Sequence, residues 1–253
     1  MEAFLDPVLG GLDMPVAIGL FVASFASSFM AIAFGMGGGT VLLAILANFL
    51  PAAALIPVHG VIQLGSNAFR AVLMSRYAVL APVASFAVGS ILGVAIGGSI
   101  VVNLSAAAVQ AGVGLFVIYS VLFKPPKLLS RAPVLTGGVS SFLTMFFGAT
   151  GIFVANFVKS LSLPRENHVA THAILMSMQH GLKILVFGLL GFAYGPWIGF
   201  TLAMIATGFL GTLAGRLVLK RMSDTGFKRI FDVLLVLIAL RLIWGAVQAW
   251  LQG

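Results

Sequence analysis

The stretch SSFMAIAFGMGG at residues 27–38 returns as SSFLTMFFGATG at residues 140–151, displaced by 113 positions. The same displacement continues to residue 70 without a gap and relates residues of equal or similar type: Pro51 and Pro164, His59 and His172, Arg70 and Lys183. A register that retains glycine, proline, histidine and a cation is not expected by chance. The repeat therefore predicts a chain made of two copies of one structural unit.

Composition places both copies in a membrane. The 253 residues are 60% hydrophobic and only 8% charged, whereas soluble domains carry about 25% charged residues. The apolar runs suit helices, because a helix needs about 20 apolar residues to cross the hydrocarbon core. The formal net charge of +8 comes from cations in short connections, which favours membrane topology over nucleic-acid binding. The sequence predicts an all-α integral membrane protein in contact with the lipid bilayer.

Ten apolar segments can be recognised, five in each copy. We expect helices at about 14–34, 38–50, 53–74, 78–101 and 105–123, and again at about 134–147, 151–162, 166–190, 195–217 and 227–250. This divides the chain into a first membrane repeat (1–123), a cytoplasmic linker (124–133) and a second membrane repeat (134–253). The segments 38–50 and 151–162 are short for a full crossing, since 13 residues extend about 20 Å, and half-helices that reach the midplane remain an alternative.

The distribution of cations predicts how the copies are oriented. If each half crosses the membrane five times, the second copy is inverted, and twelve of the 14 Lys and Arg residues fall on or toward one side. Four crossings per half would place the basic clusters on opposite sides. The positive-inside rule favours the first arrangement, which is two inverted repeats with both termini outside.

Each copy contains a glycine-rich break directly after its first long segment. Clustered glycines weaken a helix, and irregular backbone at membrane depth is tolerated where it lines a cavity or is buried in protein. The helix that begins after each break would direct its N–H groups and positive dipole end toward an anion. We expect this role for Gly37, Gly38, Gly39, Gly148, Thr150 and Gly151. By contrast, Gly93, Gly97, Gly211 and Gly215 fit close helix packing.

Polar residues follow the breaks at matching positions in both copies. Histidines and a cation inside apolar segments are functional candidates by default, although a histidine can also be satisfied by one interhelical hydrogen bond and a cation can snorkel. The expected lining of an oxyanion site comprises His59, Asn67 and Arg70 from the first copy and His172, Gln179, His180 and Lys183 from the second. Lys183 is the sharpest candidate because it lies within the apolar run 173–190.

These residues carry a resemblance to a known family. Gly35-Met36-Gly37-Gly38-Gly39 followed by Pro51, and Gly148-Ala149-Thr150-Gly151 followed by Pro164, resemble the TauE/SafE family of sulfite, sulfonate and related organosulfur-anion transporters. The resemblance extends over nearly the whole chain. It implies a multi-pass protein of the bacterial inner membrane and a small inorganic or organic sulfur oxyanion as substrate. Substrate and direction vary within the family, so sulfite export is the best expectation from the resemblance.

Other classes of function fit the sequence less well. Two histidines without a patterned carboxylate do not form a metal site, and no paired carboxylates or nucleophile motif point to catalysis. We therefore expect neither an enzyme nor a cofactor. A secondary transporter holds its substrate where two repeats meet, and this is the leading hypothesis. A passive anion channel and a non-transporting membrane assembly protein remain the alternatives.

Overall fold

The computed structural model describes residues 8–34, 37–101, 105–219 and 225–252. The described part of the chain is helical, with ten α-helices and no strands. The first half contains α2 (Met14–Ala33), α3 (Gly38–Leu46), α4 (Ala52–Leu73), α5 (Val83–Val101) and α6 (Ala106–Leu122). The second half contains α7 (Pro133–Phe147), α8 (Gly151–Ser160), α9 (Arg165–Leu189), α10 (Ile198–Val218) and α11 (Thr225–Gln252).

Every expected segment corresponds to one helix, so the all-helical prediction is confirmed. The largest difference is at α5, which begins at Val83 rather than near residue 78. The intervening residues form a short 3₁₀ helix, Ser75–Tyr77, and an irregular connection that contains Pro82. A second 3₁₀ helix, Gly195–Trp197, precedes α10. Within the described ranges, four helical stretches are long and apolar enough to cross a membrane by length and composition: Met14–Ala33, Ala52–Leu73, Val83–Val101 and Gly195–Leu217.

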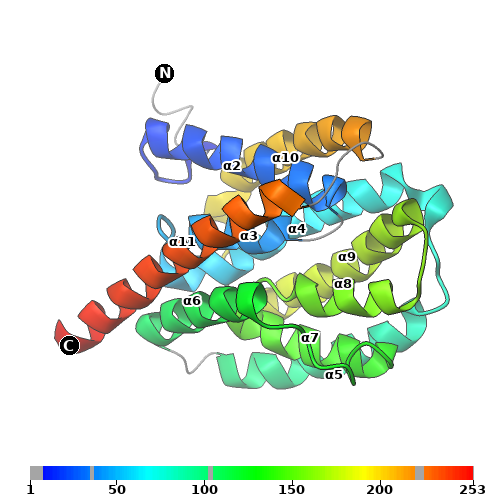
Figure 1. Ribbon diagram of the computed structural model, residues 1–253. Helices are drawn as coiled ribbons and strands as arrows, with labels where there is room; N and C mark the ends of the chain where they lie inside the picture. The colour runs from blue at the N-terminus through cyan, green and yellow to red at the C-terminus, as the bar shows by residue number, and fades with distance from the viewer. Residues whose placement is uncertain (1–7, 35–36, 102–104, 220–224, 253) are drawn as a thin grey trace.

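The helices of the two halves exchange partners. The first helix of the second half, α7, packs along α5 of the first half, and α2 of the first half packs along α10 of the second. Figure 1 shows these pairs on opposite sides of the molecule, with α4 and α9 between them. The helices α6 and α11 also pack against each other. Each of these helix pairs therefore joins one half of the chain to the other.

Glycines allow the exchanged pairs to approach closely. A Cβ at Gly93 would collide with the Gly138 carbonyl oxygen of α7, and a Cβ at Gly211 would collide with the Phe25 carbonyl oxygen of α2. A Cβ at Gly97 would meet the Met145 side chain and the Phe142 carbonyl oxygen, and a Cβ at Gly215 would meet the Ile32 side chain and the Phe29 carbonyl oxygen. Because the contacts of Gly93 and Gly211 are backbone to backbone, a side chain there could be accommodated only by separating the helices. The predicted packing role of these four glycines is confirmed.

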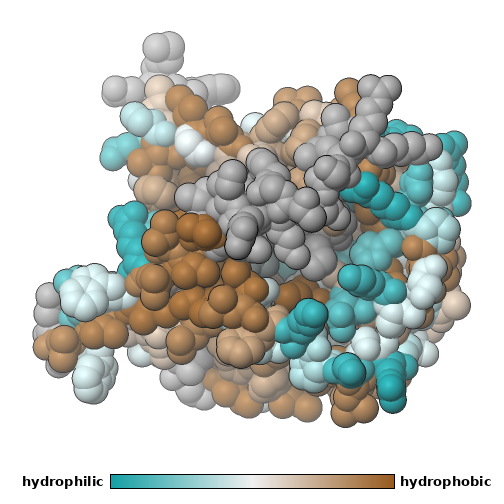
Figure 2. All heavy atoms as spheres, in the orientation of Figure 1, coloured by the Kyte–Doolittle hydropathy of each residue, from teal (hydrophilic) through white to brown (hydrophobic). Residues whose placement is uncertain are grey.

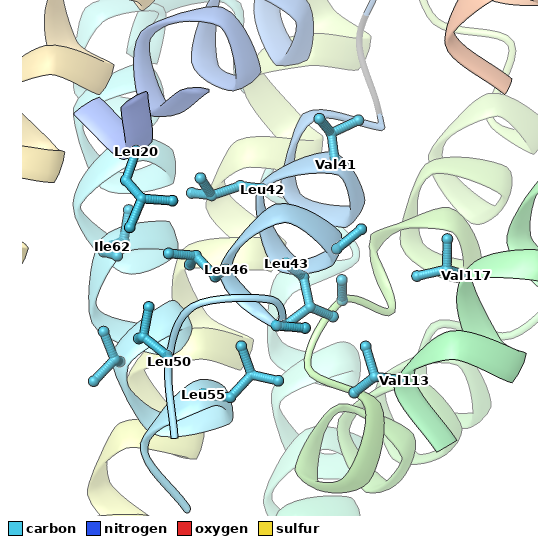
Figure 3. Close-up of a cluster of buried hydrophobic side chains, with 14 of the residues drawn as sticks. Leu20, Val41, Leu42, Leu43, Leu46, Leu50, Leu55, Ile62, Val113 and Val117 are labelled. Atoms are coloured by element: carbon cyan, nitrogen blue, oxygen red, sulfur yellow. The ribbon is translucent and has the colours of Figure 1, made fainter. Parts of the chain in front are cut away.

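The short helix α3 lies in the hydrophobic interior. Leu42, Leu43 and Leu46 of α3 are almost fully buried and pack among apolar side chains of α2, α4 and α6, as Figure 3 shows. The segment is apolar on every side, as expected for a helix surrounded by protein rather than placed at a surface. This burial fixes α3 and, with it, the glycine-rich residues at its start.

Large apolar side chains cover the outer surface. Leu115 on α6 and Leu237, Leu240 and Trp244 on α11 are exposed, and Figure 2 shows a broad hydrophobic face over these two helices. Hydrophilic residues gather instead on the side where the α4–α5 and α8–α9 connections lie. An exposed apolar surface of this extent is typical of contact with lipid hydrocarbon.

Some residues used in the sequence interpretation lie outside the described residues. These are Gly35 and Met36 of the first glycine break, and Lys220 and Arg221, two of the cations counted for orientation, between α10 and α11.

Candidate functional site

The candidate polar residues lie on two helices that pack against each other. The helices α4 and α9 occupy matching positions in the two halves. Their cations are buried rather than extended toward the surface, since Lys183 is 0% exposed and Arg70 is 2% exposed. The alternative in which Arg70 snorkels to the interface therefore does not describe this structure, in which Arg70 is buried. His59, His172 and His180 are also buried, so the two helices bring most of the predicted lining into the protein interior.

Lys183 contacts the second glycine break directly. Its Nζ donates a hydrogen bond to the carbonyl oxygen of Gly148, 3.1 Å away. Gly148 has a φ of 74°, a left-handed conformation that glycine adopts without strain. The same carbonyl oxygen accepts a hydrogen bond from Thr144 Oγ1 at 3.0 Å. The break thus turns a backbone carbonyl away from helical pairing and presents it to the amine of α9.

Each repeated histidine is bonded to the start of the short helix in its own half. His59 Nε2 lies 2.9 Å from the Gly39 carbonyl oxygen, and His172 Nε2 lies 3.3 Å from the Gly151 carbonyl oxygen. Because a carbonyl can only accept, Nε2 carries the proton in both rings when they are neutral. This leaves each Nδ1 as a buried acceptor, and neither Nδ1 has a hydrogen-bond partner. Both histidines have one unused polar atom.

The cations and histidines are paired across the two halves. Lys183 of the second half donates to the Gly148 carbonyl oxygen, and His59 Nδ1 of the first half lies 3.7 Å from the place of a Cβ on the same glycine. Under the repeat, Arg70 of the first half and His172 of the second half are the corresponding pair. His180 adds a further ring beside His59, with the ring centroids 6.0 Å apart and nearly perpendicular planes. The arrangement is two related clusters, each assembled from both copies of the repeat.

Arg70 is held by polar side chains on its own helix. Its two terminal nitrogens donate to Asn67 Oδ1 and Ser66 Oγ, both at 3.2 Å, while Nε has no partner. Ser66 Oγ also lies 3.0 Å from Ser28 Oγ on α2. The predicted face of hydroxyl, amide and cation on α4 therefore exists, and much of it serves to position the guanidinium.

Gln179 on α9 holds the second glycine break, whereas the polar side chains on α4 hold a cation. Its Nε2 donates to Thr150 Oγ1 at 2.8 Å, and its Oε1 accepts from Ser140 Oγ at 3.0 Å. Thr150 Oγ1 in turn donates to the Ser140 carbonyl oxygen at 2.8 Å. This closed ring joins α7, α9 and the start of α8. Gln179 and Thr150 therefore fix the second break in place, while Lys183 remains directed at Gly148.

The glycines of the first break have different environments. Gly37 has a φ of 92° and nothing within 4 Å of a Cβ, so it supplies the turn into α3. A Cβ at Gly38 would collide with the Ser27 carbonyl oxygen, and a Cβ at Gly39 would lie 3.0 Å from Gln63 Oε1. Gly38 is thus a packing contact between α2 and α3, whereas Gly39 faces a buried amide.

Gln63 is a polar residue of this region that the sequence interpretation missed. It is 5% exposed, lies one turn after His59 on α4 and approaches Gly39. Its partner under the repeat is Met176, so the comparison of the two copies could not reveal it. The helical spacing of His59, Gln63, Asn67 and Arg70 is the signal that would have found it.

The clusters contain basic side chains, and no carboxylate with a described side chain is paired with them. Among residues whose side chains the structure describes, the carboxylates are those of Asp13 and Glu166, and neither is buried. The candidate residues also line neither of the two clearest surface hollows. The larger hollow has a volume of about 820 Å³ and is bounded by Val79, Arg131, Phe157 and Leu163. Because the candidate side chains on α4 and α9 are almost fully buried, the interior site is closed to solvent in this conformation, and a ligand could reach it only if helices move.

Comparison with known proteins identifies one family. The model of the family described as "Sulfite exporter TauE/SafE" matches residues 20–242. The match includes both breaks and all the candidate residues on α4 and α9. No curated protein and no solved structure gives a significant match.

Proposed function

Because the chain belongs to the TauE/SafE family, whose members are membrane transporters of sulfite or related anions, we propose that it is a secondary transporter that exports sulfite or a related small sulfonate. We further propose the bacterial inner membrane as its location. The two halves would be inverted repeats, and the substrate would bind between α4 and α9, where the repeats meet.

The observation that carries the proposal is the pair of buried cations without buried carboxylates. A charged group costs several kcal/mol to bury unless it is paired. Lys183 has a carbonyl partner and Arg70 has amide and hydroxyl partners, and neither is bonded to a carboxylate whose side chain the structure describes. An oxyanion placed between the two clusters would supply that counter-charge. The unused Arg70 Nε and the N–H groups at the start of α8 are additional donors for its oxygen atoms.

The closed conformation favours transport by alternating access over passive conduction. The candidate residues are packed inside the protein, and α4 and α9 contact the exchanged pairs α2–α10 and α5–α7. Movement of one exchanged pair relative to α4 and α9 would open the site to one side at a time. A passive channel would instead need a continuous polar path, and the closely packed glycine contacts of α5–α7 and α10–α2 leave no space for one between these helices.

The test is transport by purified protein in proteoliposomes with labelled sulfite, ethanesulfonate and sulfate as probes. We expect saturable uptake of sulfite or ethanesulfonate that is accelerated by unlabelled substrate on the opposite side. Linear flux without acceleration would identify a channel. Absence of flux with all three anions, in protein whose helical content is intact, would contradict a transport function for these substrates.

A further inference from the structure

Lys183 and Arg70 occupy equivalent positions of the repeat but differ in what they can do with a proton. The guanidinium of Arg70 remains charged in proteins, whereas a lysine amine can lose its proton when it is buried. Arg70 has two side-chain oxygen atoms to accept its hydrogen bonds. Lys183 has the single carbonyl oxygen of Gly148. The two cationic positions are therefore chemically unequal: one charge is permanent and the other can be removed.

The surroundings of Lys183 can accommodate its side chain both as a neutral amine and as an ammonium. The side chain crosses to α4 at Gly60, where a Cβ would lie 2.8 Å from its Cε. A neutral amine and an ammonium both donate hydrogen bonds, so the contact with Gly148 is retained in both states. The ammonium alone requires a counter-charge. Since neither carboxylate with a described side chain is buried, a bound substrate is the counter-charge available to it.

The other titratable groups near Lys183 are histidines. His59 faces it from α4, and His180 precedes it by one turn on α9. Arg70 and His172 form the second cluster on the same two helices. The helices α5 and α7 contain no titratable side chain, and the Lys159 side chain of α8 is exposed. His59 Nδ1 and His180 Nδ1 have no hydrogen-bond partner, so each is a buried acceptor near the amine.

We propose that the protein carries one proton with each anion and that the amine of Lys183 holds this proton during transport. The inference rests on the proposed function, because it needs an anion at this site. In the empty site Lys183 is a neutral amine. Binding adds one anion and one proton, which gives an ammonium–anion pair, and release on the other side returns both. For a monoanionic sulfonate the cycle is electroneutral, and proton and anion move in the same direction.

The experiment compares the wild-type protein with Lys183→Arg in proteoliposomes that contain a pH-sensitive dye. Arginine already occupies the equivalent position in the first half, and it keeps its charge. Ethanesulfonate is the main probe because it has no titratable proton near neutral pH. Sulfite is measured in parallel against protein-free liposomes, which account for its own acid–base chemistry. Lys159→Arg, an exposed lysine on α8, is the matched control.

We expect the wild-type protein and Lys159→Arg to move protons when either anion is added, and an imposed pH gradient to drive anion accumulation at zero membrane potential. In Lys183→Arg, anion-driven proton movement should fall at least tenfold, while anion flux becomes sensitive to membrane potential. Undiminished proton coupling in Lys183→Arg would overturn the assignment to Lys183. Wild-type transport of anions without protons would overturn the coupling and leave the proposed function intact, whereas absence of anion transport would remove both. The wild-type measurement decides on coupling even if Lys183→Arg does not fold.

Discussion

The Nζ of Lys183 lies 3.1 Å from the carbonyl oxygen of Gly148, which joins the buried cation of α9 to the glycine break between α7 and α8. This contact connects the two features that the repeat singled out separately. It also places the cation beside the start of α8, where backbone N–H groups are directed toward the same region. A site that combines an ammonium with a helix N-terminus is suited to a small oxyanion.

Replacement of Lys183 by methionine tests whether its charge serves the anion. Lys183→Met keeps most of the side-chain length but removes the charge. We expect sulfite or ethanesulfonate binding to weaken at least tenfold, equivalent to about 1.4 kcal/mol. The melting temperature should stay the same or rise, because a buried polar group is replaced by an apolar one. Calorimetric titration of purified protein measures the first effect and thermal unfolding the second. Unchanged affinity would leave Lys183 a structural role only.

The proximity of Lys183 and His59 predicts energetic coupling between the two repeats. In a double-mutant cycle with His59→Gln and Lys183→Met, the effects on anion affinity should deviate from additivity by about 0.5–3 kcal/mol, the range seen for residues in contact. His59→Gln combined with Lys159→Met is the control, because Lys159 is exposed on α8, and these effects should add. Equal behaviour of the two pairs would show that His59 and Lys183 do not act on the same ligand.

The close packing of α10 on α2 predicts a large difference between two glycine substitutions. A Cβ at Gly211 would collide with backbone of α2, whereas a Cβ at Gly245 on α11 has nothing within 4 Å. Gly211→Ala should lower the melting temperature clearly. Gly245→Ala should be neutral or stabilising by up to about 1 kcal/mol, because alanine favours helix. Thermal unfolding in detergent compares them directly, and an equal shift in both would refute the packing role of Gly211.

The inverted arrangement predicts where two connections lie relative to the membrane. Reporter fusions after residue 128, in the linker between α6 and α7, and after residue 222, between α10 and α11, should both report the cytoplasm. The reason is that the positive-inside rule groups most cations on one side only if each half crosses an odd number of times. Fusions that report opposite sides would exclude inversion, whatever their expression level.

The repeat explains why so much of the fold could be predicted. Apolar length placed the helices, and the glycine breaks at 35–39 and 148–151 marked where α3 and α8 begin. The exchange of helix partners between the halves could not be predicted. It depends on which neighbouring helix each glycine-containing face contacts, such as the faces of Gly93 and Gly211. A sequence gives the small residues but not the helix that they contact.

The candidate site was predicted in its residues but not in its division of roles. Repeat positions identified Arg70 and Lys183, and the structure shows that both are buried. The sequence could not distinguish residues that face a ligand from residues that position others, since that depends on hydrogen bonds between distant segments. Gln179, which joins Thr150 and Ser140, and Gly38, which packs on Ser27, are cases where a predicted lining residue mainly supports the structure.

Location of the bound anion tests the central claim most directly. Selenite resembles sulfite in shape and charge, and selenium can be located in a crystal by anomalous scattering. In crystals soaked with selenite, we expect an anomalous peak next to Lys183 Nζ and the start of α8, displaced by excess sulfite and absent from Lys183→Met crystals. A peak confined to another place, such as the surface hollow beside Arg131, with none near Lys183 in protein that transports selenite, would contradict the account.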